Sequence, residues 1–74
     1  MHTSLHVTTA ALDRLAQLVQ GRLRGRLHDF RLDVRDDGLV LRGHVNTYYA
    51  KQLAQQAVMN ASTLRIVANE IDVF

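Results

Sequence analysis

The 74-residue sequence contains no cysteine. This absence excludes a disulfide-stabilised scaffold, a zinc site with thiolate ligands and a cysteine nucleophile. Proline and tryptophan are also missing, and no apolar run reaches the length of a signal-peptide core or a membrane span. Nine basic against seven acidic residues give a formal net charge of only +2. This balance does not by itself indicate nucleic acid or anionic lipid as a ligand.

What remains is a short chain with room for one hydrophobic core. Hydrophobic residues make up 47% of it, and no repeat or linker divides it. We predict a flexible N-terminal tail at residues 1–8 and a single domain at residues 9–74. Such a domain buries only about 60% of its unfolded surface, so a partner or second copy would stabilise it. As given, the chain is expected in the cytoplasm, or in the periplasm or at a membrane if it is cut from a longer protein.

Apolar residues at spacings of three and four predict a first helix from Thr9 to about Arg24. Thr8 or Thr9 would cap its start, and Gly25 suits the left-handed residue that ends a helix. The stripe expected to face the core consists of Leu12, Leu15, Ala16, Val19 and Leu23.

A hairpin is expected next, because residues 30–35 alternate strictly between apolar and charged and are followed by Asp36-Asp37-Gly38. With Asp37 and Gly38 as the central residues of a type I′ turn, the apolar residues of both strands share one face. Gly43 would then leave room for a closely packed helix. The predicted pairs are Asp36 with Leu39, Val34 with Leu41, Leu32 with Gly43, and Phe30 with Val45.

A second helix is predicted from about Thr47 to Met59, with Asn46 as its N-cap and Asn60 as a left-handed C-cap. A last strand is expected from Leu64 to Val73. The helix stripe expected to face the core is Tyr49, Ala50, Leu53, Ala54, Ala57 and Val58. The apolar side of the strand would carry Val67, Ile71 and Val73, together with Asn69. The amide of Asn69 needs a buried partner, for which the neighbouring backbone is expected.

This order predicts an α+β fold, α-β-β-α-β, with two helices packed on one face of a three-stranded mixed sheet. Residues 39–41 form the densest apolar run, so their strand is placed in the centre, antiparallel to the first strand and parallel to the last. The opposite face is mostly charged and is expected to lie in water. It would carry Arg31, Asp33, Arg35, Val40, Arg42, His44, Glu70 and Asp72.

Two motifs within this pattern resemble the BON domain family. The segment DGLVLRGHV at residues 37–45 is similar to the strand–Gly–V-x-L-x-G-x-V core of that family, and VANEIDV at residues 67–73 resembles its closing V-x-N-x-I-x-V. The likeness spans roughly residues 12–73, although the chain has one copy where tandem copies are common, and no signal peptide. The resemblance implies a non-enzymatic module of bacterial envelope and osmotic-stress proteins that attaches to phospholipid surfaces or other envelope components.

No catalytic or metal-binding constellation is apparent. The four histidines, of which His44 is expected opposite Arg31, lack the spacing of a zinc site. Asp36 and Asp37 are explained as turn-forming residues. The serines have no histidine and carboxylate placed locally to activate them. We therefore expect no enzymatic activity, no metal and no cofactor.

Arg22, Arg24, Arg26 and His28 fall within seven residues that contain no acid. They are either a solvated helix end whose arginines satisfy terminal carbonyls, or a docking site for anionic lipid headgroups. Nucleic acid is not expected as a partner, because a broad basic stripe with stacking aromatics is missing. The leading hypothesis is therefore attachment to anionic phospholipid surfaces or envelope components through these residues.

A second candidate surface lies at the start of the second helix. Tyr48 is expected to point to solvent, and together with Lys51, Gln52 and Gln55 it would form a polar helix face. This face could meet a partner protein. The alternative hypothesis is therefore a protein–protein interaction or homo-oligomerisation domain.

Overall fold

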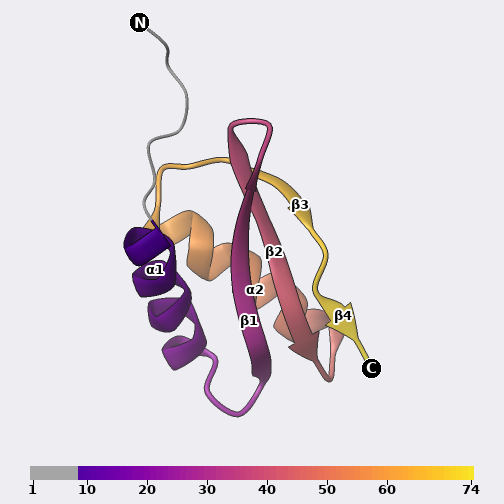
Figure 1. The fold of residues 1–74 in the computed structure, drawn as a ribbon. Coiled ribbons are helices and arrows are strands. Elements are labelled where there is room, and N and C mark those ends of the chain that lie inside the picture. Colours follow the sequence, from indigo (N-terminus) through magenta and orange to yellow (C-terminus); the bar gives the residue numbers. More distant parts are fainter. Residues whose placement is uncertain (1–8) are drawn as a thin grey trace, which may run out of the picture.

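The computed structural model of the protein describes residues 9–74, so the tail predicted at residues 1–8 lies outside the described part. The strands form one mixed sheet in the order β1-β2-β3, and β4 pairs with β2 beyond the end of β3 (Figure 1). The predicted α+β fold with a central second strand is confirmed, but the expected last strand is divided in two. The elements are α1 (Thr9–Arg22), β1 (Leu27–Arg35), β2 (Gly38–Val45), α2 (Tyr48–Ala61), β3 (Ile66–Asn69) and β4 (Asp72–Val73).

Helix α1 ends at Arg22, two residues before its predicted end. The Leu23 N–H still donates to the carbonyl of Val19 at 3.1 Å, and the Leu27 N–H donates to that of Leu23 at 3.1 Å. Gly25 lies between them with a φ of 82°, as expected of the residue that reverses the chain after a helix. The α1–β1 turn is therefore fixed by backbone hydrogen bonds at both sides.

The hairpin turn lies one residue earlier than the sequence pattern predicts. Its two turn residues are Asp36 and Asp37, with φ values of 51° and 63°, and the flanking pair is Arg35 with Gly38. Near the turn, the predicted pairing is therefore wrong by two residues, which leaves these side chains on their expected faces. Beyond the register shift in β1 the difference is three residues, because Val45 pairs with Leu27 and not with Phe30. Val34 pairs with Leu39, Leu32 with Leu41, and Leu27 with Val45.

Gly38 starts β2 because the third strand passes close to it. A Cβ atom at this position would overlap the side chain of Val67 and lie 3.0 Å from the carbonyl oxygen of Arg65. The β2–β3 register shifts at this point, between Leu39 and Val40. Val67 is thus displaced from the apolar side predicted for it, whereas Ile71 is buried there.

Gly43 lies opposite an irregular part of β1 rather than beneath a helix, as the sequence suggests. The register shifts between His28 and Arg31, so that His44 pairs with His28 and not with Arg31. A Cβ at Gly43 would lie 3.1 Å from the His28 carbonyl oxygen and 3.3 Å from Cα of Phe30, and its φ is 156°. The glycine is required by the close approach of β1.

Helix α2 is capped by Thr47, not by Asn46. The Ala50 N–H donates to the Thr47 hydroxyl at 3.0 Å, which satisfies one of the free donors of the first turn. Asn60 remains helical, because α2 continues to Ala61 and ends in an extended Ser62. The alanine stripe and Val58 are buried as predicted, whereas Tyr49 is 64% exposed and does not join the core.

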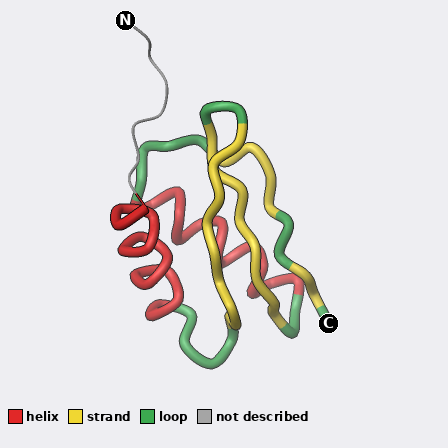
Figure 2. The backbone as a smooth tube through the Cα atoms, in the orientation of Figure 1, coloured by secondary structure: helices red, strands yellow, loops and turns green. Residues whose placement is uncertain are grey.

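The core fills the space between the helices and one face of the sheet. Figure 2 shows α2 running behind the strands, with α1 alongside β1. On the outer face, Val40 is only 1% exposed. The charge pattern predicts that this face is exposed to solvent, but Val40 is an exception. Within residues 9–74, no helix has both the length and the apolar character needed to cross a membrane. The aliphatic side chains with the least exposure are Val19, Leu27, Leu39, Val40, Leu41, Val45, Val58 and Ile71.

We predict that Gly43→Ala destabilises the domain by about 2 kcal/mol, because the added Cβ crowds the backbone of β1 and the residue must keep an unfavourable φ. The melting temperature, followed by circular dichroism, should fall by roughly 10 °C. Gly21→Ala is the matched control, since a Cβ there meets nothing within 4 Å and replaces a helical glycine. It should raise stability by about 0.5–1 kcal/mol. An unchanged melting temperature for Gly43→Ala would contradict the described packing.

Candidate functional site

The α1–β1 turn presents three arginines around two buried leucines. Leu23 and Leu27 are 5% and 2% exposed, whereas Arg22, Arg24 and Arg26 are all exposed. Within residues 9–74, none of these arginines forms an ion pair or donates a side-chain hydrogen bond to a helix carbonyl. The interpretation in which they satisfy the end of α1 therefore has no contact to support it. Their guanidinium groups are available to an external anion.

The four residues of the predicted basic site divide into two pairs. Arg24 and His28 line a hollow of about 540 Å³ beside α1. Arg22 and Arg26 line another of about 220 Å³ between the turn and α2. The structure thus spreads the positive charge around one turn and does not converge it on a single pocket. This arrangement suits contact with an extended charged surface better than the enclosure of one small anion.

The four residues of the second predicted surface are brought together. Tyr48, Lys51, Gln52 and Gln55 line a hollow of about 480 Å³, to which Gln56 and Asn69 also contribute. Tyr48 is 63% exposed, as the sequence predicts. Apart from Lys51, the polar groups around this hollow are neutral, so it offers hydrogen bonds more than charge.

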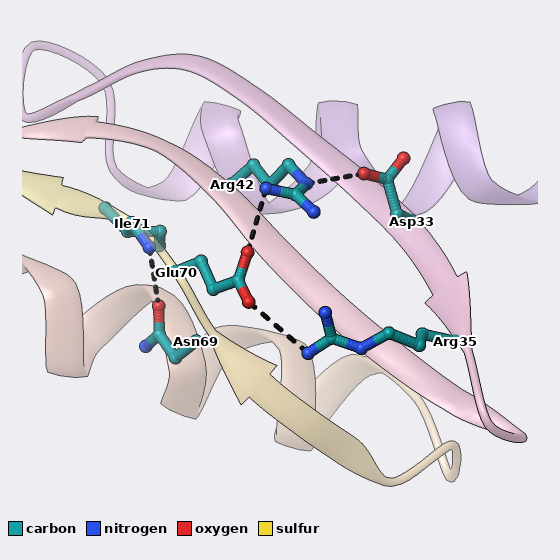
Figure 3. Close-up of polar contacts among 6 residues, drawn as sticks. All are labelled: Asp33, Arg35, Arg42, Asn69, Glu70 and Ile71. Carbon is teal, nitrogen blue, oxygen red and sulfur yellow. Dashed lines mark hydrogen bonds and ion pairs between the residues drawn. The ribbon is translucent and has the colours of Figure 1, made fainter.

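Asn69 joins this hollow to the core. Its Nδ2 donates to the carbonyl of Lys51 at 3.3 Å and to Oε1 of Gln55 at 3.1 Å. Its Oδ1 accepts from the N–H of Ile71 at 3.3 Å (Figure 3). The predicted partner in the neighbouring backbone is therefore present, and two further partners come from α2. One side chain fixes the end of β3 to the helix that covers it.

A network of ion pairs crosses the outer face of the sheet (Figure 3). Nε of Arg42 lies 2.6 Å from Oδ2 of Asp33, and its Nη1 lies 2.8 Å from Oε1 of Glu70. Nη2 of Arg35 lies 3.3 Å from the other oxygen of Glu70. The hydrogen bond that Arg42 donates to Asp33, followed by the charge of Glu70, raises the pKa of Arg42 above its ordinary value. These exposed ion pairs add little to the stability of the domain. Their positive and negative charges nevertheless compensate one another on this face.

His44 and Asp72 lie on the same face, where the end of β2 pairs with β4. Nδ1 of His44 is 3.5 Å from Oδ2 of Asp72, and the His44 and Phe74 rings are 6.0 Å apart. Across the part of the chain that the structure describes, no three potential metal-ligating side chains converge. His2 and His6 lie outside that part. The ion-pair network of Asp33, Arg35, Arg42 and Glu70 is not predicted from the sequence, because it depends on which charged residues of adjacent strands become neighbours.

Comparison of the chain with models of known protein families, with curated proteins and with solved structures finds no match.

We predict that Asn69→Ala destabilises the domain by about 1–3 kcal/mol, because it leaves the N–H of the buried Ile71 without its acceptor. Urea denaturation followed by circular dichroism measures this change. Gln52→Ala serves as the control, since it truncates an exposed side chain of the same hollow and should shift stability by less than about 0.5 kcal/mol. Equal stabilities for the two variants would show that the Asn69 contacts do not hold β3 to α2.

Proposed function

We propose that this chain is a non-enzymatic, BON-like attachment module that docks to anionic phospholipid surfaces through Arg22, Arg24 and Arg26, with His28 beside them. The observation that carries the proposal is the state of these three arginines, which are exposed and without ion pairs among residues 9–74. The α-β-β-α-β order of the fold is the order that the family resemblance implies.

The contrast with the outer face of the sheet supports the choice of this turn. Arg35 and Arg42 are held by Asp33 and Glu70, so their charge is compensated within the domain. Among residues 9–74, the arginines of the α1–β1 turn have no such partner. Each basic residue near an anionic membrane contributes about 1 kcal/mol, and this attraction is screened by salt over about 10 Å at 0.1 M.

We expect the triple variant Arg22→Gln/Arg24→Gln/Arg26→Gln to bind anionic vesicles about 100-fold more weakly, because three such contributions are lost. The measurement is co-sedimentation with phosphatidylglycerol vesicles at low and high salt, with phosphatidylcholine vesicles as the neutral comparison. Binding of the unmodified chain should be salt-sensitive and confined to the anionic vesicles.

The matched control removes the same charge elsewhere. Arg14→Gln/Arg31→Gln/Arg65→Gln also replaces three exposed arginines, so both variants lower the formal net charge from +2 by the same amount. If both triple variants lost binding equally, net charge rather than the α1–β1 turn would govern docking. If the Arg22/Arg24/Arg26 variant bound like the unmodified chain, the proposed site would be wrong.

A second candidate function is protein–protein interaction or homo-oligomerisation through the surface formed by Tyr48, Lys51, Gln52 and Gln55. The observation that favours it is the hollow of about 480 Å³, in which Tyr48 stands 63% exposed among neutral hydrogen-bonding side chains. Exposed tyrosines surrounded by amides are typical of protein interfaces.

For self-association through this surface, we expect the mass in sedimentation equilibrium to rise with concentration. The variant Tyr48→Ala/Gln52→Ala should remain a monomer over the same range, because it removes the exposed ring and one of the amides beside it. A constant monomer mass for the unmodified chain would rule out homo-oligomerisation.

A further inference from the structure

We call the α1–β1 turn with Arg22, Arg24 and Arg26 the basic turn. The sheet has one end beside this turn, and three paired residues mark that end. Val45, the last residue of β2, pairs with Leu27 at the start of β1 and with Val73 at the end of β4. The chain segments beyond these three residues must therefore leave the sheet at the same end, which Figure 1 shows at the lower edge of the molecule. We call this the Val45 end.

Three exposed aromatic side chains belong to this end. Tyr48 and Tyr49 start α2 shortly after Val45, and they are 63% and 64% exposed. Phe74 follows Val73, is 69% exposed, and its N–H donates to the carbonyl of Val45 at 2.9 Å. The chain has only four aromatic residues of the Phe, Tyr and Trp types, and Phe30 alone is buried in the core.

The basic turn adjoins one of these aromatic residues, Tyr49. Arg26 and Tyr49 line the same hollow of about 340 Å³, together with Gly25, Asn46, Thr47 and Ala50. The guanidinium of Arg26, which has no ion pair among residues 9–74, and the exposed ring of Tyr49 thus open onto one depression. Aromatic rings beside basic side chains are the combination that favours the interface of an anionic bilayer, where rings reach the acyl boundary and cations contact the headgroups.

We propose that the Val45 end is the membrane-facing end of the domain, and that Tyr49 and Phe74 enter the headgroup region of an anionic phospholipid bilayer while Arg24 and Arg26 contact the phosphates. This inference rests on the proposed function and adds to it an orientation and an apolar contribution. The distribution of charge supports the orientation, although Asp29 and Asp72 lie beside His44 near the Val45 end, where Nδ1 of His44 is 3.5 Å from Oδ2 of Asp72. The acidic hairpin turn, Asp36-Asp37, lies at the opposite end of β1 and β2 and points away from the membrane.

The absence of tryptophan from the chain permits a direct test. Tyr49→Trp and Phe74→Trp each place a single fluorescent reporter at the Val45 end. Val34→Trp places one at a residue that is 45% exposed beside the hairpin turn. On addition of phosphatidylglycerol vesicles, we expect the emission of the first two variants to shift to shorter wavelength and become protected from an aqueous quencher, while the third stays unchanged.

A second variant measures the apolar contribution without a reporter. Tyr49→Ser/Phe74→Ser should reduce binding to phosphatidylglycerol vesicles at high salt on the order of tenfold, because apolar contacts persist when charge is screened. Val34→Ser/Met59→Ser is the matched control, since it also replaces two exposed apolar side chains, one beside the hairpin turn and one near the last turn of α2, both away from the Val45 end.

The outcomes separate this inference from the function on which it rests. Vesicle binding with shifted emission only at positions 49 and 74 supports both. Vesicle binding with no shift at those positions, and with full binding by Tyr49→Ser/Phe74→Ser, overturns the orientation and leaves docking by the arginines intact. Failure of the unmodified chain to bind phosphatidylglycerol vesicles overturns both.

Discussion

The pairing of β2 with every other strand is the constraint on which the rest of the structure depends. Its residues are buried or half-buried throughout, and it contacts β1 on one side and β3 and β4 on the other. Two glycines make this possible, because Gly38 admits β3 and Gly43 admits the irregular part of β1. A parallel third strand also requires a crossover, which explains why α2 must lie between β2 and β3 in the sequence. The helices then cover the one face that the alternation leaves apolar.

Much of this arrangement could be predicted from periodicity, because side chains facing the core recur at every third or fourth position in α1 and at every second in β1. The exact hairpin turn could not. A two-residue shift in pairing leaves all faces unchanged, so alternation cannot distinguish Asp36-Asp37 from Asp37-Gly38 as the turn. The usual preference for glycine within the turn was misleading here, since Gly38 is needed for the close approach of β3. Similarly, the register shift that displaces Val67 depends on how β3 pairs with β2, so the sequence of β3 alone does not predict it.

The candidate sites differ in how far sequence could reveal them. The basic turn is continuous in the chain, so its charge is visible without any structure, and the burial of Leu23 is predicted from the helical stripe. The burial of Leu27 is not predicted. The Val45 end is discontinuous. Tyr49 is predicted to face the core because it fits the helical stripe, but it lies in the first turn of α2 at the edge of that stripe and is 64% exposed. Phe74 joins it through the pairing of Val73 with Val45.

The formal net charge of +2 does not describe how the charges are distributed over the fold. Glu70 is shared by Arg35 and Arg42, and Asp33 also binds Arg42, so the outer face of the sheet compensates its own charges. Asp36 and Asp37 form the hairpin turn, where both have positive φ values. At the opposite end, Arg22, Arg24 and Arg26 have no ion pair among residues 9–74, and Arg26 lies beside the exposed ring of Tyr49. Because the strand register separates these two ends, it sets the direction in which the domain would approach an anionic surface.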